Sequence, residues 1–215
     1  MAETLFYKIK YTTKLELVSG LHIGDSKDNV EIGGVDNPVV RRKDNQQPYI
    51  PGSSLKGKIR CLLEQIAGAS DVGGNEGINK VFGIAKKENT IPSRIIFRDA
   101  YLDDASVEML KGSPNTDMPF TELKFENSID RIKGVADNPR QQERIPAGAS
   151  FKLEFVINAW GDSEDKANAN ANTCLDMLKR GLKALENDYL GGSGSRGYGQ
   201  VKIDIDGMKS EKIAL

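Results

Sequence analysis

A glycine-rich loop near the C-terminal end constrains the fold of this chain most strongly. Five glycines and one arginine lie between Leu190 and Gly199. Glycine lets backbone amides approach a phosphate closely and adopt positive φ without steric cost. The glycines at 192, 194 and 197 match the dinucleotide fingerprint, but that fingerprint must follow a strand and begin a helix. Here an amphipathic helix precedes the loop and an alternating segment follows, which favours a phosphate-rich polymer or a plain helix-to-strand connection over a dinucleotide.

The composition is that of an ordinary globular protein. Of the 215 residues, 38% are hydrophobic and 28% are charged, and we expect one domain over residues 1–215. No apolar run approaches the roughly 18 residues needed to span a bilayer, and residues 1–11 do not resemble a signal peptide. Cys61 and Cys174 form no CxxC pair, which argues against a structural zinc site. We therefore expect a cytoplasmic protein without a membrane partner.

The charge is unevenly distributed along the chain. The formal net charge of −1 argues against a protein that binds nucleic acid indiscriminately. Residues 40–60 nevertheless contain one acid, Asp44, and six basic residues: Arg41, Arg42, Lys43, Lys56, Lys58 and Arg60. Such a local excess of positive charge predicts either a groove that holds a polyanion or a solvated loop.

Hydrophobic periodicity predicts the order β-α-β-β-α-β. Residues 5–18, 151–157 and 201–205 alternate apolar and polar side chains, 94–102 resembles a further strand, and a break is expected near Thr12. The first helix should begin at a Ser53 or Ser54 cap. Its apolar stripe is Leu55, Ile59, Leu62, Leu63 and Ile66, and that of the second helix is Ala171, Leu175, Leu178, Leu182 and Leu185.

This order is the ferredoxin-like, or split βαβ, arrangement that RNA-recognition motifs also use. We expect an α+β fold with that βαββαβ core and two long insertions, a lid-like catalytic loop at 25–51 and a thumb-like insertion at 103–150. Residues 69–79 are predicted to form a loop, and 122–132 one arm of a hairpin within the second insertion. Long insertions in a compact domain are usually functional.

Two residues near the first strand are candidates for chemistry. His22 is the only histidine, which excludes a two-histidine acid–base pair and favours a structural hydrogen bond. Asp36 lies in an Asp-Asn-Pro sequence that is typical of turns. A carboxylate in this loop could instead reach a 2′-hydroxyl or a Mg²⁺ ion beside a phosphate, because such ions use only one or two protein carboxylates there.

The start of the first helix and the arm at 122–144 each allow two interpretations. Residues 51–58 lack the spacing of a nucleotide-hydrolysing loop. Free helix amides together with Lys56 would attract a phosphate, whereas an ordinary capped helix with solvated lysines fits equally well. The arm mixes acids, arginines and amides without the aromatic pattern of base-stacking platforms. It is either a wedge-like hairpin or a salt-bridged surface arm.

Six segments in this order resemble one protein family. They are GLHIG at 20–24, DNPVV at 36–40, IPGSSLKGK at 50–58, KFEN at 124–127, NPRQ at 138–141 and the glycine loop. Over almost the whole chain, they resemble the repeated backbone subunit of the Csm-type (type III-A) CRISPR effector, a member of the RAMP superfamily. The sequence around Asp36 and the KFEN-to-NPRQ arm are the segments most specific to that subunit.

The resemblance implies a helical filament of copies along a CRISPR guide RNA, together with other Csm-type subunits. A thumb-like hairpin would displace a nucleotide at regular intervals, and complementary single-stranded target RNA would be cut there with Mg²⁺ or Mn²⁺. The family's catalytic aspartate aligns with Asp36, which is also the candidate metal ligand. Residues linked to guide binding or maturation align with His22, Lys56, Glu122, Glu126, Arg131 and Glu143. Further RNA-binding candidates in the same segments are Ser53, Lys58, Arg60, Asn138, Arg140, Gly192, Gly194 and Arg196.

Two functions of different classes remain open at this point. The first is a metal-dependent endoribonuclease subunit that cuts target RNA within the assembled complex, and the second is a non-catalytic RNA-binding scaffold of a CRISPR filament. A nuclease that matures precursor RNA alone is disfavoured by the single histidine. Guide–target pairing would supply sequence specificity, so no base-reading platform is required. Many modest grooves along the filament would supply affinity despite the low net charge.

Overall fold

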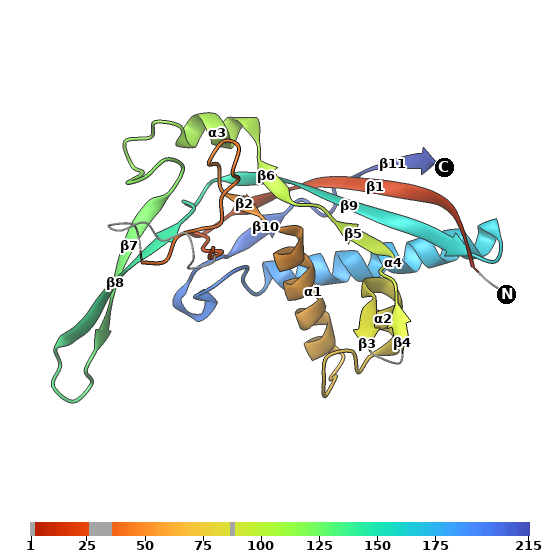
Figure 1. Cartoon of the computed structure of the whole chain (residues 1–215), viewed down its shortest axis with the longest axis horizontal. Coiled ribbons are helices and arrows are strands. Elements are labelled where there is room, and N and C mark those ends of the chain that lie inside the picture. The colour runs from red at the N-terminus through yellow and green to blue at the C-terminus, as the bar shows by residue number, and fades with distance from the viewer. Residues whose placement is uncertain (1–2, 26–35, 87–88) are drawn as a thin grey trace.

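The computed structural model describes residues 3–25, 36–86 and 89–215, and its centre is an antiparallel sheet in a mixed α and β fold (Figure 1). Two long strands, β1 (Thr4–Leu17) and β9 (Ser150–Gly161), pair along most of their length. The other strands of the sheet are β10 (Val201–Ile203) and β11 (Lys209–Ala214) beside β1, β5 (Ile95–Phe97) and β6 (Ala100–Leu102) beside β9, and β2 (Tyr49–Ile50) beside β6.

The alternation in the two long strands sorts their side chains between core and solvent. Leu15 of β1 pairs with Phe151 of β9, and both side chains are completely buried. The break expected near Thr12 is wrong, because Thr12 pairs regularly with Glu154 and the register shift lies between Leu5 and Tyr7. Threonine is β-branched and fits an extended strand well, so a threonine pair does not interrupt one.

Helix α1 (Gly52–Ile66) begins at a tertiary contact instead of the predicted serine cap. Its N-cap is Pro51 without a side-chain bond, and the Gly52 N–H donates to Asp99 Oδ1 at 2.8 Å. A Cβ at Gly52 would lie 2.5 Å from the carbonyl oxygen of Phe97, so the helix starts too close to β5 for a larger residue. The single strand predicted at 94–102 is therefore two strands, interrupted where Asp99 turns toward the helix.

Helix α4 (Glu164–Glu186) packs against β9 and against α1 on one face of the sheet (Figure 1). Its predicted stripe is buried at Ala171, Leu178, Leu182 and Leu185, and Leu175 is half-buried. Ile66 of α1 is 61% exposed, contrary to prediction, because the buried position near that end is taken by Glu64, which is paired with Arg60. None of the described helices is long and apolar enough to cross a membrane.

Several short elements were not predicted. They are α2 (Glu76–Phe82), β3 (Ile84–Lys86), β4 (Asn89–Ile91), α3 (Asp104–Leu110) and β11. The loop predicted at 69–79 is thus wrong in its last residues, where Asn75 caps α2 by accepting from the Ile78 N–H. Asp103 caps α3 in the same way, through the Ser106 N–H. Capping side chains allow such short helices within sequence that lacks clear periodicity.

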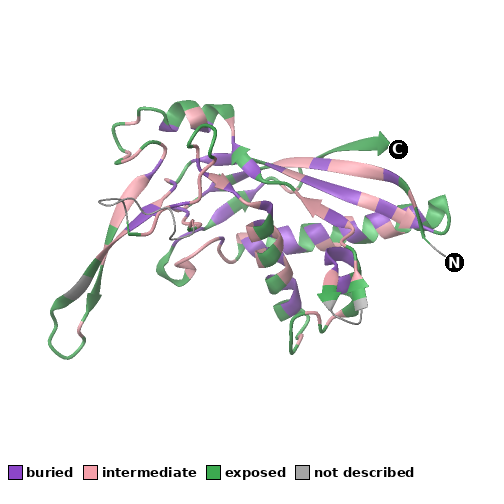
Figure 2. Cartoon of the chain, viewed as in Figure 1, coloured by how far each residue is buried: buried purple, intermediate pink, exposed green. Residues whose placement is uncertain are grey.

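The hairpin arm predicted at 122–132 is present, and its strand ends at Ile129. Strands β7 (Glu122–Ile129) and β8 (Ala136–Arg144) form a separate two-stranded sheet that projects from the body (Figure 1). Most of its outer half is exposed (Figure 2), including Ile129 at 67% and Ile132 at 96%. A hairpin with so little of its own core is held by the contacts at its base.

Two glycines in the packed helices test this description of the core. A Cβ at Gly181 of α4 would clash with Cγ2 of the fully buried Ile59, whereas a Cβ at Gly57 of α1 would meet nothing within 4 Å. Alanine improves helix propensity by about 1 kcal/mol, and overpacking costs about 1–3 kcal/mol. We expect Gly57→Ala to raise the free energy of unfolding and Gly181→Ala to lower it, as measured by urea denaturation. Stabilisation by both substitutions would contradict the close contact between α1 and α4.

Candidate functional site

Segments far apart in the sequence meet at the base of the hairpin. The segment 20–24, which follows β1, is their common neighbour, since Leu21 and Ile145 exchange two backbone hydrogen bonds of 2.9 and 2.8 Å. On the other side, the Gly192 N–H of the glycine loop donates to the His22 carbonyl at 2.8 Å. The segment 36–41 contacts the same segment through the Val40 N–H, which donates to the Ile23 carbonyl. The hairpin, the glycine loop and the Asp36 segment are therefore adjacent.

The glycine loop is the predicted connection from α4 to β10, and its glycines are required by close packing. At Gly191 the backbone has φ of +77°, and a Cβ would clash with the His22 carbonyl oxygen. A Cβ at Gly194 would clash with the ring of Tyr189. Residues Gly194–Arg196 form a single 3-10 turn, and the Arg196 side chain at its end is 50% exposed. The loop thus exposes backbone and one arginine beside His22.

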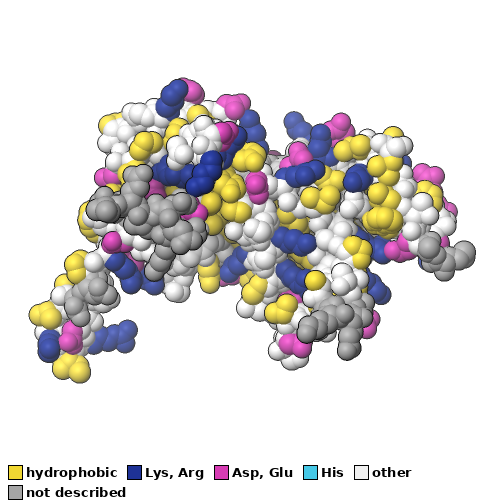
Figure 3. All heavy atoms as spheres, in the orientation of Figure 1, with side chains coloured by type: hydrophobic (Ala, Val, Ile, Leu, Met, Phe, Trp, Pro, Cys, Tyr) yellow, Lys and Arg dark blue, Asp and Glu magenta, His cyan; other side chains and the backbone are white. Residues whose placement is uncertain are grey.

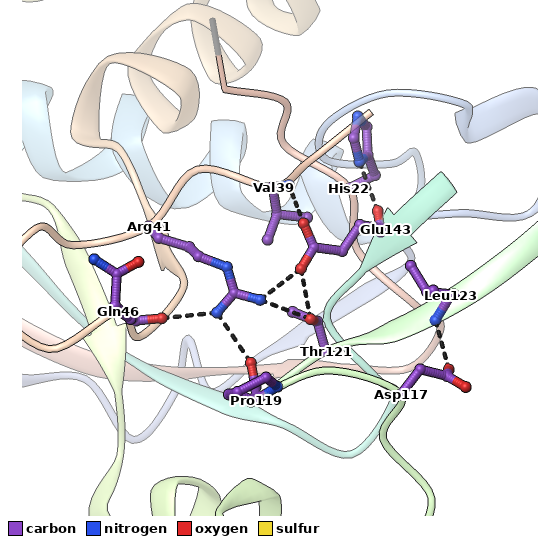
Figure 4. Close-up of polar contacts among 9 residues, drawn as sticks. All are labelled: His22, Val39, Arg41, Gln46, Asp117, Pro119, Thr121, Leu123 and Glu143. Carbon is purple, nitrogen blue, oxygen red and sulfur yellow. Dashed lines mark hydrogen bonds and ion pairs between the residues drawn. The ribbon is translucent and has the colours of Figure 1, made fainter. Parts of the chain in front are cut away.

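Glu143 of β8 is the most deeply buried charged residue of this cluster, with 1% of its side chain exposed. Its Oε2 accepts the Val39 N–H at 2.7 Å, and its Oε1 accepts from Thr121 Oγ1 at 2.6 Å and Arg41 Nη2 at 2.5 Å (Figure 4). Its carbonyl oxygen bonds His22 Nδ1 at 2.7 Å. The family resemblance predicts an RNA contact at Glu143, but its carboxylate oxygens are bonded inside the protein, where they hold the surrounding segments together.

Arg41 points into the same cluster. Its Nη1 donates to the carbonyl oxygens of Gln46 and Pro119 at 2.7 and 2.9 Å, and 16% of its side chain is exposed (Figure 4). The basic group at 40–60 is consequently not one continuous surface. Figure 3 shows basic side chains in small groups among acidic ones on the visible face.

Asp36 lies exposed at the edge of this cluster, where its Oδ2 accepts the Gln141 N–H of β8 at 3.2 Å. Asn37 bridges in parallel to Gln142, so the segment follows β8. In the described part of the chain, no group of three or more His, Cys, Asp or Glu side chains could hold a metal ion. A lone carboxylate suits a cation that phosphate and water also coordinate. The rest of the insertion predicted at 25–51 falls partly on residues 26–35, outside the described residues.

Glu126 and Tyr198 join the hairpin to the glycine loop. The Tyr198 hydroxyl donates to Glu126 Oε1 at 2.7 Å, and Arg140 and Arg196 approach Oε2 at 3.1 and 3.5 Å. The hydrogen bond from Tyr198, together with those basic groups, lowers the pKa of Glu126. Burial, followed by the bond to Glu126, raises the pKa of Tyr198 to about 12, which keeps its hydroxyl a donor. In the sequence, nothing distinguishes Tyr198 from the other members of the glycine loop.

The other predicted hairpin residues divide between the base and the tip. Glu122 pairs with Arg144 at 2.5 Å, and Arg144 also lies over the Tyr198 ring. Arg140 has an Nε that is buried without a hydrogen-bond partner in the described structure. Arg131 is exposed in the turn between the strands. Asn138 is a position of β8 whose side chain lies outside the described part.

The start of α1 lies beside the glycine loop. Lys58 pairs with Asp188 at 2.7 Å and its ammonium sits 3.5 Å from the centre of the Tyr189 ring. Ser53 is exposed in the first turn. Lys56 has no ion pair or hydrogen bond among the described residues, and burial, followed by the nearby Arg60, lowers the pKa of its ammonium.

Arg60, predicted to contact RNA, is directed inward. Its guanidinium bonds Glu64 at 2.9 Å, the Gly83 carbonyl at 2.5 Å and Asn79 Oδ1 at 2.8 Å. All three acceptors belong to the junction between α1 and α2, so Arg60 serves the packing of those helices.

Comparisons with known proteins agree with this architecture. The family model described as RAMP superfamily matches residues 14–202. A protein named CRISPR system Cms endoribonuclease Csm3 from Methanothermobacter thermautotrophicus is 42% identical over 86% of this chain and 79% of its own length. Its namesake from Streptococcus thermophilus is 39% identical over 93% of this chain and 88% of its own.

A solved structure has the same overall fold. The crystal structure of a Csm3–Csm4 subcomplex from the type III-A CRISPR-Cas interference complex contains a chain with a TM-score of 0.60 and 32% identity to this one, covering 98% of this chain and 82% of that one. The similarity covers 98% of this chain, so most of its fold is shared with a chain from this class of CRISPR complex. The chain therefore belongs to the RAMP superfamily and, within it, to the Csm3 family. The resemblance inferred from its motifs is confirmed.

The Glu126–Tyr198 contact predicts a pH dependence of stability. Because the folded pKa of Glu126 is below its usual 4.5, the contact stabilises the fold above that pH and is lost as pH falls through the folded pKa. In urea unfolding from pH 3 to pH 7, the difference in free energy between wild type and Glu126→Gln should be largest near neutrality and shrink below about pH 4. Glu108→Gln, at an exposed position of α3, is the control. A difference that is constant with pH would contradict this assignment.

Proposed function

We propose that this chain is the repeated backbone subunit of a type III-A CRISPR complex, in which it binds guide RNA and cuts complementary target RNA at regular intervals. Its relatives at 42% and 39% identity are named endoribonucleases, and a solved relative forms a subcomplex with Csm4. The observation that carries the proposal is the position of Asp36, an exposed carboxylate bonded to the base of a projecting hairpin.

Cleavage would occur where the hairpin β7–β8 displaces a nucleotide of the guide–target duplex. A displaced nucleotide can place its 2′-hydroxyl in line with the phosphorus. The hydroxyl would lose its proton as its oxygen bonds to phosphorus, and the bond to the 5′-oxygen would break as that oxygen takes up a proton, which leaves a 2′,3′-cyclic phosphate. Asp36 lies at the base of this wedge and would face the exposed sugar and phosphate. A Mg²⁺ or Mn²⁺ ion shared by Asp36, phosphate and water would stabilise the charge on the phosphate.

The guide RNA would follow the glycine loop and the start of α1. Arg196, which is 50% exposed, and Lys56, which has no ion pair among the described residues, would present positive charge without base readout, and Gly192 and Gly194 would lie against the RNA backbone. The remaining proposed RNA contacts are His22, Ser53, Lys58, Arg131, Asn138 and Arg140. Three carboxylates, Glu122, Glu126 and Glu143, would position these residues, because each is bonded to arginine, tyrosine or backbone groups. Arg60 is left out of this set.

The proposal extends to assembly and core topology. Copies of the chain would stack along the guide beside other Csm-type subunits in the cytoplasm, and multivalent contact would compensate for the net charge of −1.

We also propose a ferredoxin-like βαββαβ core. The chain order β1, α1, β5–β6, β9, α4, β10 and the spatial order β10-β1-β9-β6 support it.

Asp36→Asn tests the catalytic part of this proposal. The complex is reconstituted with guide RNA and incubated with a matching target and Mg²⁺, and the fragments are separated by length. We expect the wild type to give regularly spaced fragments and Asp36→Asn to give none, because the amide neither carries the charge nor binds a hard cation well.

The matched control is Asp176→Asn, an exposed aspartate in the middle of α4. It should leave the fragment pattern unchanged, and both variants should retain guide RNA. If Asp36→Asn cuts at the same positions as the wild type, Asp36 is not catalytic. If the wild-type complex binds target but never cuts it, the subunit is a scaffold.

Lys56 and Arg196 should govern guide affinity through their charge. Each phosphate contact to a single strand contributes about 0.7 to the slope of log affinity against log salt. We expect Lys56→Ala and Arg196→Ala each to weaken guide binding and to reduce that slope by about 0.7 in a salt titration. Lys166→Ala, an exposed lysine in the first turn of α4, should change neither quantity. An unaltered slope would remove the substituted residue from the contacts.

A further inference from the structure

We propose that Arg41 is a positioning residue that acts through Glu143 to hold the Asp36 segment in place at the hairpin base. This inference rests on the proposed function of Asp36. Arg41 was grouped with the basic residues that would attract a polyanion, but the structure directs it into the protein.

The guanidinium of Arg41 connects three separate parts of the chain. It donates to the Gln46 carbonyl in its own loop, to Pro119 and Thr121 just before β7, and to Glu143 near the end of β8 (Figure 4). These four contacts are 2.7, 2.9, 2.7 and 2.5 Å long. Only 16% of the Arg41 side chain is exposed, so its charge is directed into the protein and away from any RNA on the surface.

Glu143 passes this constraint to Asp36. The same carboxylate that bonds Arg41 accepts the Val39 N–H at 2.7 Å, and the Glu143 N–H donates to the Asn37 carbonyl at 3.2 Å. Asp36 is the next residue along the chain, and the Gln141 N–H bonds its carboxylate from the same strand. The segment that carries Asp36 is thus held along β8, and its far end is held by Arg41.

Loss of the guanidinium would leave the Glu143 charge buried without a counter-ion. A buried carboxylate in that state must either take up a proton or move toward water, and both changes weaken its bonds to Thr121 and Val39. The Asp36 segment would then lose its register with the hairpin. A displacement of about 1 Å in a reacting group can lower a rate by roughly a hundredfold without affecting substrate binding.

Lysine cannot replace Arg41 in this role. The planar fork of arginine reaches several acceptors at fixed angles, whereas the ammonium of lysine is a compact point charge on a flexible stem. Lysine would retain the counter-charge for Glu143 but not the simultaneous bonds to Gln46, Pro119 and Thr121.

The test measures single-turnover cleavage of a matching target over a range of complex concentrations at saturating Mg²⁺. Complexes contain wild type, Arg41→Met, Arg41→Lys, Arg42→Met or Gly181→Ala. Arg42 is the matched control, because its guanidinium pairs with Asp44 within its own turn. Gly181→Ala controls for a general loss of stability, since the clash lies between α1 and α4.

We expect Arg41→Met to lower the rate at saturation roughly tenfold or more, with the half-saturating concentration within about twofold of wild type. The rate at saturation of Arg41→Lys should lie between those of wild type and Arg41→Met. If Arg41→Met does not assemble, the rate of Arg41→Lys tests the proposal. Both controls should keep the wild-type rate. An unchanged rate in Arg41→Met would overturn the proposal. A raised half-saturating concentration with an unchanged rate would also overturn it, because that result marks a direct RNA contact.

Amide hydrogen exchange on the full chain separates this inference from the proposed function. The Val39 N–H, which donates to Glu143, should exchange at least about tenfold faster in Arg41→Met, as the opening of a single hydrogen bond predicts. Arg42→Met should leave it unchanged. If the wild-type complex fails to cut any target, the nuclease proposal fails, and accelerated exchange at Val39 would still support Arg41 as the anchor of this segment. Unchanged exchange in Arg41→Met would overturn that role.

Discussion

The buried carboxylate of Glu143 is the interaction on which the rest of this site depends. With 1% of its side chain exposed, it would be unstable as an anion unless charge and hydrogen bonds replaced its water. Arg41, Thr121 and the Val39 N–H replace that water, and they come from the loop after the first strand and the segment before the hairpin. The negative charge of Glu143 is tolerated only if these segments meet. Its burial therefore selects one arrangement of segments that have no regular secondary structure.

A second polar contact completes the link between the hairpin and the body. Glu126, on β7, accepts the hydroxyl of Tyr198 in the glycine loop. The hairpin itself buries little apolar surface, and its outer half carries exposed residues such as Ile132. Its direction is therefore set by polar contacts at its base and not by a core of its own. A projecting arm fixed only at its base suits an element that inserts between nucleotides, while the sheet and its helices keep their shape.

Much of the regular structure was predictable, because hydrophobic periodicity reports burial on one face. Alternation located β1 and β9, and helical spacing located α1 and α4. The elements that were missed, such as α2 and α3, are short and begin at single capping side chains, Asn75 and Asp103, which resemble ordinary loop residues in sequence. The serine cap predicted for α1 is wrong, because the carboxylate that accepts the first N–H of the helix belongs to Asp99, 47 positions away from Gly52.

Local pattern and the order of motifs were enough to predict the two long strands, the two long helices, the glycine loop between α4 and β10, and the family. Which charged residues are bonded inside the protein could be learned only from the folded chain. Lys56 is unpaired among described residues, whereas Arg41, Arg60 and Glu143 turn inward to partners in the protein. A charged side chain looks the same in sequence in both situations. The difference lies in contacts such as Arg41 to Glu143, 102 positions apart, which no local pattern encodes.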